Sequence, residues 1–175
     1  MIESKYLKAD SQNIEKLMVI PGLKKFKTEH LCTLLRQSKI RKYEHGEVII
    51  QEGDADPWLY FVLSGKVKIL KQGEVIIVIE RQGEVLGEMS LIDGSVRSST
   101  IRSEGNTICL AVDSSASNTL VSKEEKKEYL LILYKIFMDA MSARLRLRTE
   151  EIAAVRKENS RLREEFERIK KQLGK

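Results

Sequence analysis

The amino-acid sequence predicts an α+β protein, mainly β: a jelly-roll-like β-roll with flanking short helices and a long C-terminal coiled-coil helix. Short β-branched runs between residues 48 and 112 are separated by glycines roughly every 7–12 residues, as in sandwiches and rolls. After Lys127, apolar residues recur instead at steps of three and four as far as Leu173, which indicates an amphipathic helix with heptads. We therefore expect a roll domain with N-terminal helices at residues 1–122 and a dimerisation helix at residues 123–175.

Two short helices are expected before the roll. Apolar residues have helical spacing over residues 11–20, and the breaker pair Pro21-Gly22 ends that segment. A second helix is expected to begin near Thr28, whose hydroxyl suits an N-cap, and to bury Leu31 and the leucines that follow it. Both helices are predicted to cover the core of the roll.

The strands of the roll are expected in five β-rich runs: residues 48–50, 58–63, 67–70, 75–79 and 107–112. Ser64-Gly65 and Gln72-Gly73 have the composition of hairpin turns. The run Val75–Ile79 is apolar on both faces, which predicts a strand buried inside the roll.

The composition of Gly83–Ile101 predicts a loop that holds a small anion beside a hydroxyl-rich group. Gly87 lacks a Cβ atom, so a ligand can approach the backbone closely there. One helical turn at Glu88–Leu91 would offer N–H groups without intrahelical partners, which bind anions. Arg97 supplies a planar fork of donors for two phosphate oxygens, the two following serines add hydroxyls, and the Glu88 carboxylate would accept from a sugar hydroxyl.

The segments Gly87-Glu88-Met89-Ser90-Leu91 and Arg97-Ser98-Ser99 resemble, with the right gap, the phosphate-binding cassette of cyclic nucleotide-binding domains. The Arg-Ser pair is similar to that of the bacterial cAMP receptor protein (catabolite activator) family. The resemblance covers about residues 18–148 and implies that Arg97 binds the cyclic phosphate and Glu88 the ribose 2′-hydroxyl. It also implies a cradle completed by Gly87, Met89, Ser90, Ser98 and Ser99. The alternative for these residues is a β-hairpin with a surface arginine and a solvated glutamate.

The apolar series of the long helix predicts a parallel two-stranded coiled coil. Ile152 and Asn159 both occupy a positions, and a buried Asn there costs stability but fixes register and favours a parallel dimer. In that dimer glutamates at g would each face a cation at e of the partner helix. A single helix packing on its own domain is the alternative. The expected seam comprises Leu145, Ile152, Val155, Asn159, Leu162, Phe166, Ile169 and Leu173.

The resemblance also assigns residues of the long helix to the nucleotide base. Arg148 and Thr149 match the base-contacting pair by position, but Arg148 replaces the usual Thr or Ser, which leaves the identity of the base open. Transcription factors of the family continue from this helix into a helix-turn-helix domain. Here the heptads run to Lys175, and no such domain fits.

Composition excludes several other classes. The sequence shows neither a nucleophile–base constellation nor a metal-ligand set, since its two histidines lie in unrelated contexts, so we expect neither an enzyme nor a metal or other cofactor. Without an apolar run near 18 residues, no membrane span is expected. Cys32 and Cys109 lie in apolar patterns, which predicts buried thiols in a reducing, cytoplasmic setting. Residues 144–175 carry eleven basic and six acidic residues, a surplus equal to the net charge of +5 of the whole chain.

The function expected from these observations is a homodimeric sensor of a cyclic nucleotide, with cAMP as the first candidate, that signals through its long helix to an unknown partner. The alternative is a cAMP-responsive DNA-binding regulator that is truncated or acts through a partner, which only basic residues such as Arg144, Arg146 and Arg148 support. Specific nucleic-acid binding is not expected, because the stretch before the heptads is apolar rather than basic. If Arg97 serves only a ligand, its loss should leave folding little changed.

Overall fold

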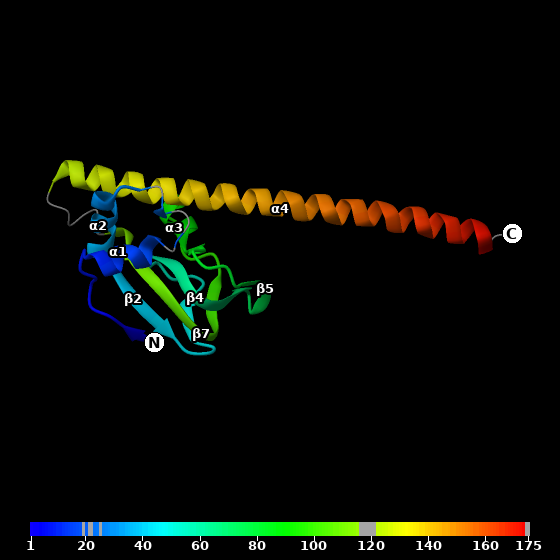
Figure 1. Ribbon diagram of the computed structural model, residues 1–175. Coiled ribbons are helices and arrows are strands. Elements are labelled where there is room, and N and C mark those ends of the chain that lie inside the picture. Colours follow the sequence, from blue (N-terminus) through cyan, green and yellow to red (C-terminus); the bar gives the residue numbers. More distant parts are fainter. Residues whose placement is uncertain (19, 21–22, 25, 116–121, 174–175) are drawn as a thin grey trace. The chain divides into compact units, whose positions relative to one another are not determined.

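The computed structural model describes residues 1–18, 20, 23–24, 26–115 and 122–173 (Figure 1). The chain divides into two compact units, Met1–Phe137 and Met138–Lys175, each of which is described by itself. The helices are α1 Ser11–Met18, α2 Thr28–Arg36, α3 Glu88–Asp93 and α4 Lys123–Leu173. The strands are β1 Ile2–Glu3, β2 Ser38–Tyr43, β3 Val48–Ile50, β4 Trp58–Lys71, β5 Glu74–Ile79, β6 Val85–Leu86 and β7 Thr100–Asp113.

Two antiparallel 14-residue strands, β4 and β7, form the spine of the first unit. The strand order is β1-β2-β7-β4-β5, while β3 pairs with β7 and β6 pairs with β4. Each spine strand has different neighbours along its length, because β2 pairs with residues 107–112 of β7 whereas β3 pairs with residues 101–102. The spine therefore takes part in both layers of a roll, and the predicted jelly-roll-like α+β fold is confirmed. The helices α1 and α2 lie at one end of the long strands (Figure 1).

The predicted hairpin turn at Ser64-Gly65 is wrong, because β4 continues through it. The register with β7 shifts on both sides of Ser64, so the glycine marks a bulge within one long strand. Gly65 has φ +93°, and a Cβ atom there would lie 2.3 Å from the carbonyl oxygen of Asn106. Thr107 Oγ1 donates to the carbonyl oxygen of Lys66 at 2.7 Å and closes the ladder beyond the bulge.

The second predicted turn, at Gln72-Gly73, is confirmed: it joins β4 to β5 with positive φ at both residues. The prediction that Val75–Ile79 is buried inside the roll is wrong. The strand β5 is an edge of the sheet, and Val75, Ile76 and Val78 are 52%, 62% and 41% exposed. Its β-branched composition gives strand propensity without burial.

The first predicted helix is confirmed as α1, while Pro21 and Gly22 lie outside the described residues. The second helix begins at Thr28 as expected. Its N-cap position, however, is Lys27, and no side chain caps it, so the predicted capping role of Thr28 is wrong. The helix buries Leu31 and two further leucines.

Buried side chains cover both faces of the spine strand β4. Tyr60 and Val62 of β4 belong to a buried cluster with Cys109 and Ala111 of β7. Leu59 and Phe61 alternate with Tyr60 and Val62 along β4 and are also fully buried, so both faces of this strand are covered.

Helix α4 contributes to both units. In the first unit it buries residues at helical spacing, Tyr129, Ile132, Leu133, Ile136 and Phe137. From Leu145 to Leu173 every residue is exposed in the single chain. The division of the chain within the helix, after Phe137, lies beyond the expected boundary at residues 122–123, because these first turns pack in the roll unit. Within the described residues, no helix is long and apolar enough to cross a membrane.

Candidate functional site

The loop between β6 and β7 forms the predicted helical turn. Gly87 follows β6 directly with φ +84°, Glu88 begins α3, and Gly94 ends it in the same left-handed conformation. A Cβ atom on Gly87 would lie 2.5 Å from Arg97 Nη1 and 3.0 Å from Ile50 Cδ1. Glycine is therefore required here both by its backbone conformation and by the close approach of the Arg97 guanidinium.

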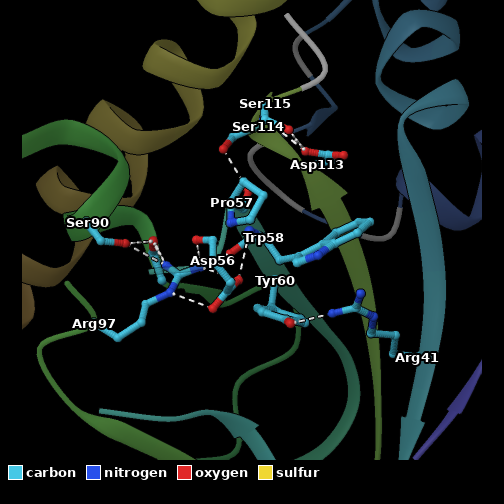
Figure 2. Close-up of polar contacts among 11 residues, drawn as sticks. Arg41, Asp56, Pro57, Trp58, Tyr60, Ser90, Arg97, Asp113, Ser114 and Ser115 are labelled. Atoms are coloured by element: carbon cyan, nitrogen blue, oxygen red, sulfur yellow. Dashed lines mark hydrogen bonds and ion pairs between the residues drawn. The ribbon is translucent and has the colours of Figure 1, made fainter. Parts of the chain in front are cut away.

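The guanidinium of Arg97 is the centre of the site and is only 2% exposed (Figure 2). Its Nη1 donates to Ser90 Oγ at 2.7 Å and to the carbonyl oxygen of Gly87. Its Nη2 donates to Asp56 Oδ1 at 2.8 Å, to the Asp56 carbonyl oxygen at 3.0 Å and to the Trp58 carbonyl oxygen. Its Nε donates to Asp56 Oδ2 at 3.2 Å. All three guanidinium nitrogens therefore already have acceptors from the protein.

Asp56 is the internal anion of this site. Burial by itself raises the pKa of the Asp56 carboxyl. Hydrogen bonds from Arg97 and from the backbone N–H of Trp58, together with the positive charge of Arg97, lower it by more. The pKa of Asp56 is therefore below its ordinary value. The Trp58 N–H donates to Asp56 Oδ1 at 2.9 Å. The carboxylate side chain is 33% exposed, which leaves it accessible from solvent. An external anion at Arg97 would compete with this carboxylate for the Nε and Nη2 donors.

Long-range backbone pairing brings Asp56 and Arg97 together. The backbone N–H of Arg97 donates to the carbonyl oxygen of Asp54 at 2.8 Å. The backbone N–H of Gly53 donates to the carbonyl oxygen of Arg97 at 2.9 Å. Lys71 Nζ contacts Glu52 Oε1 at 2.7 Å and also donates to the carbonyl oxygen of Ser98. The tip of the β4–β5 hairpin is thus tied to both sides of the site.

The structure brings three of the expected cradle residues, Gly87, Ser90 and Arg97, into direct contact. Glu88 is 3% exposed at the first position of α3, whereas Met89 is 52% exposed. The remaining cradle residues, Ser98 and Ser99, follow Arg97 on the chain; Ser98 is exposed and Ser99 is half-buried.

The two residues expected to contact the base, Arg148 and Thr149, lie on α4 in the second unit and are exposed. Within that helix, Arg148 Nη1 contacts Glu151 Oε2 at 2.6 Å, and Thr149 Oγ1 donates to the carbonyl oxygen of Leu145 at 2.8 Å. Their role toward a base stays a prediction.

Sequence reasoning missed Asp56 and Trp58. The only local signal was an acidic residue just before a long strand, and nothing in that pattern links position 56 to position 97. In the part of the chain that the structure describes, no three His, Cys, Asp or Glu residues gather as a metal site.

The chain is similar in sequence and in fold to proteins of one known family. Residues 40–124 match the model of the cyclic nucleotide-binding domain. The cGMP-dependent protein kinase 2 of Homo sapiens is 30% identical over 128 residues, which are 69% of this chain and 17% of that protein. The chain thus spans about a sixth of the length of that kinase.

Two solved structures share the fold. A cyclic nucleotide-binding domain from Methylobacillus flagellatus has a TM-score of 0.66 at 22% identity, covering 86% of this chain and 87% of that one. The catabolite activator protein of Thermus thermophilus has a TM-score of 0.58 at 24% identity, covering 77% of this chain and 62% of that one. The family match runs from within β2 through β7 and includes Asp56, Trp58, Gly87, Ser90 and Arg97. The chain therefore contains a domain of the cyclic nucleotide-binding family.

Proposed function

We propose that this chain is a homodimeric cyclic-nucleotide sensor, that cAMP is its ligand, and that its output is a change in the coiled coil formed by α4. The observation that carries the proposal is the assembled contact of Arg97 with Gly87 and Ser90 inside the matched family domain. The Arg97 guanidinium is buried and its partner carboxylate is within reach of solvent, so a small anion can compete for its donors.

Binding proceeds in this proposal by exchange of one anion for another. A cyclic phosphate oxygen takes over hydrogen bonds of Arg97 that Asp56 now accepts. Because Asp56 is partly exposed, its carboxylate moves toward water at a lower cost than a fully buried one. The ribose hydroxyl is assigned to Glu88, which adjoins Gly87 in the chain.

The dimer is proposed from the exposed apolar stripe of the second unit. Ile152, Val155 and Phe166 are 54%, 60% and 64% exposed in the single chain. Such a stripe along an isolated helix needs a partner, and the occupant proposed here is a second copy of the same helix. Charge complementarity supports this choice, since Glu151, at g, would face Arg156, at e, of a parallel copy, and the two following g–e pairs also have opposite charges.

Calorimetric titration of the protein with cAMP, cGMP and a cyclic dinucleotide tests the ligand. We expect cAMP to bind most tightly, and Arg97→Ala to weaken it by roughly 30- to 1000-fold, which corresponds to about 2–4 kcal/mol of charge-assisted hydrogen bonding. Arg102→Ala is the matched control, because Arg102 is an exposed arginine of β7, the strand that follows Arg97. Equal cAMP affinity in the wild type and Arg97→Ala would refute the assignment of Arg97.

Sedimentation of the full chain tests the assembly separately. We expect a dimer at micromolar concentration. A monomer under those conditions would refute the coiled-coil output and leave the ligand assignment standing.

A further inference from the structure

The first seven residues form a segment, here called the strap, that lies along the β2 edge of the sheet. Its strand β1 pairs with β2 through Ile2↔Lys42 and Glu3↔Arg41. The N–H groups of Ser4 and Leu7 donate at 2.9 Å to carbonyl oxygens of β2. Ile2, in contrast, is 70% exposed. The strap is therefore held by backbone hydrogen bonds and charge rather than by apolar burial, as is typical of segments that open locally at low cost.

Ion pairs at both Met1 and Glu3 hold the strap: the Met1 ammonium contacts Glu47, and Glu3 contacts two cations of β2. The Glu3 carboxylate contacts Lys39 Nζ at 2.7 Å and Arg41 Nε at 2.6 Å. The hydrogen bond from Lys39 is the largest influence on the Glu3 carboxyl and, with that from Arg41, holds its pKa below the ordinary value although burial opposes the shift. Arg41 is only 9% exposed, so the ion pair extends from the strap toward the interior of the roll.

Arg41 stacks on the aromatic residues at the start of β4. Its guanidinium lies 4.1 Å from the centre of the Trp58 ring, and its Nη1 donates to the Tyr60 hydroxyl. The intervening strand β7 has small residues at this level, because Cys109 is the partner of Arg41 and Ala111 is the partner of Tyr60. Side chains of β2 and β4 can therefore meet across it.

Trp58 also belongs to the Arg97 site. Its N–H donates to Asp56 Oδ1, and its carbonyl oxygen accepts from Arg97 Nη2, while its ring covers Arg41. Figure 2 shows Trp58 and Tyr60 between Asp56 and Arg41. The positive charge of Arg41 adds to that of Arg97 in lowering the pKa of the Asp56 carboxyl. Glu3 thus contacts the Arg41 guanidinium directly, and Trp58 connects that guanidinium with Asp56.

We propose that the strap is an inhibitory element whose docking through Glu3 opposes anion binding at Arg97. An incoming phosphate releases Asp56 from Arg97, and in this proposal Arg41, stacked on the adjacent Trp58, stabilises the released carboxylate. Glu3 already occupies Arg41, and two carboxylates at one guanidinium repel each other. Ligand binding therefore loosens the strap, and undocking of the strap strengthens ligand binding by the same factor, as linkage requires.

Glu3→Gln tests the coupling, which rests on the proposed function for its ligand. We expect its dissociation constant for cAMP to be about 3- to 10-fold lower than that of the wild type. Glu80→Gln is the matched control, because Glu80 forms a similar exposed ion pair with Lys66 far along the sheet, and its affinity should equal that of the wild type. Saturating cAMP should also speed amide hydrogen exchange of residues 2–7 in the wild type. Unchanged affinity in Glu3→Gln, or unchanged exchange in the strap, would overturn the proposal.

A ligand-free measurement keeps the two proposals distinguishable. In Arg97→Gln the Asp56 carboxylate loses its own cation without any nucleotide and competes with Glu3 for Arg41, so exchange in the strap should quicken, and the added change Asp56→Asn should reverse this. The fluorescence of Trp58, the single tryptophan of the chain, should shift in Glu3→Gln but not in Glu80→Gln. If the wild type binds none of the nucleotides, the proposed function fails. Hydrogen exchange in the strap and the fluorescence of Trp58 still test whether Glu3 and the Arg97 site are coupled. Strap exchange in Arg97→Gln equal to that of Arg97→Gln/Asp56→Asn would overturn the coupling.

Discussion

Replacement of Arg97 by glutamine should destabilise the fold as well as weaken ligand binding. The change leaves the Asp56 carboxylate without its cation and the carbonyl oxygens of Gly87 and Trp58 without their donor. Removal of one partner of a buried ion pair costs about 3–5 kcal/mol. Because the Asp56 side chain is 33% exposed, the lower end applies, about 3 kcal/mol. At ~2–4 °C per kcal/mol for a chain of this length, the Tm should fall by about 6–12 °C.

Thermal unfolding without ligand, followed by circular dichroism, measures this loss. The double variant Arg97→Gln/Asp56→Asn removes both charges, so it should be less destabilised than the sum of the single variants by about 1–3 kcal/mol. Arg102→Gln, which replaces an exposed arginine of β7, should stay within about 0.5 kcal/mol of the wild type. A Tm of Arg97→Gln that matches that of the control variant would refute the reasoning. The expectation that Arg97 is dispensable for folding is replaced by this one, because the side chain is 2% exposed and bonded to the protein throughout.

Four further predictions concern other parts of the molecule. Gly87→Ala should lower both stability and cAMP affinity, since its Cβ would meet Arg97 Nη1 at 2.5 Å; unchanged affinity by titration would contradict the packing argument. Because the pKa of Asp56 is depressed in the folded state, its contribution to stability is complete above its ordinary value of 3.8 and is lost as the pH falls through the folded-state pKa. Denaturant unfolding of the wild type and Asp56→Asn between about pH 5 and pH 2.5 should therefore show the wild type losing more stability, and parallel curves would exclude this linkage. Asn159→Val should stabilise the assembly yet add trimers to the dimer in sedimentation, whereas a purely dimeric variant would argue against the register role of Asn159. Selection from a random duplex DNA library should yield no cAMP-dependent palindromic site, only salt-sensitive binding with dissociation constants of ~10⁻⁴ to 10⁻⁶ M; a palindrome would favour the DNA-binding alternative.

The sequence predicted local features of the fold best. Turn chemistry located Gln72-Gly73, and the spacing from Gly87 to Arg97 identified residues that the structure brings into contact. It did not distinguish the bulge at Gly65 from a hairpin turn, because a glycine with positive φ serves both and the difference depends on pairing with Asn106 and Thr107 of β7.

Features that depend on long-range pairing were not predictable in the same way. The Val75–Ile79 run has the composition of a buried strand, but the sheet order makes it an edge. Asp56 is 41 residues from Arg97 along the chain, and the backbone bonds of residues 53–54 to Arg97 bring them together. No local periodicity in a single sequence indicates that two residues so far apart along the chain are in contact.

The internal carboxylate at Arg97 has a consequence for the lifetime of the protein in a cell. Since Asp56 satisfies the guanidinium, the site stays folded when no anion is present, and we expect little of the unfolded state that proteases remove. In the proposed sensor, the amount of folded protein would then depend little on the nucleotide concentration. A fall in nucleotide concentration would return Asp56 to Arg97 within the same molecule, so each copy could report many successive pulses before it is replaced.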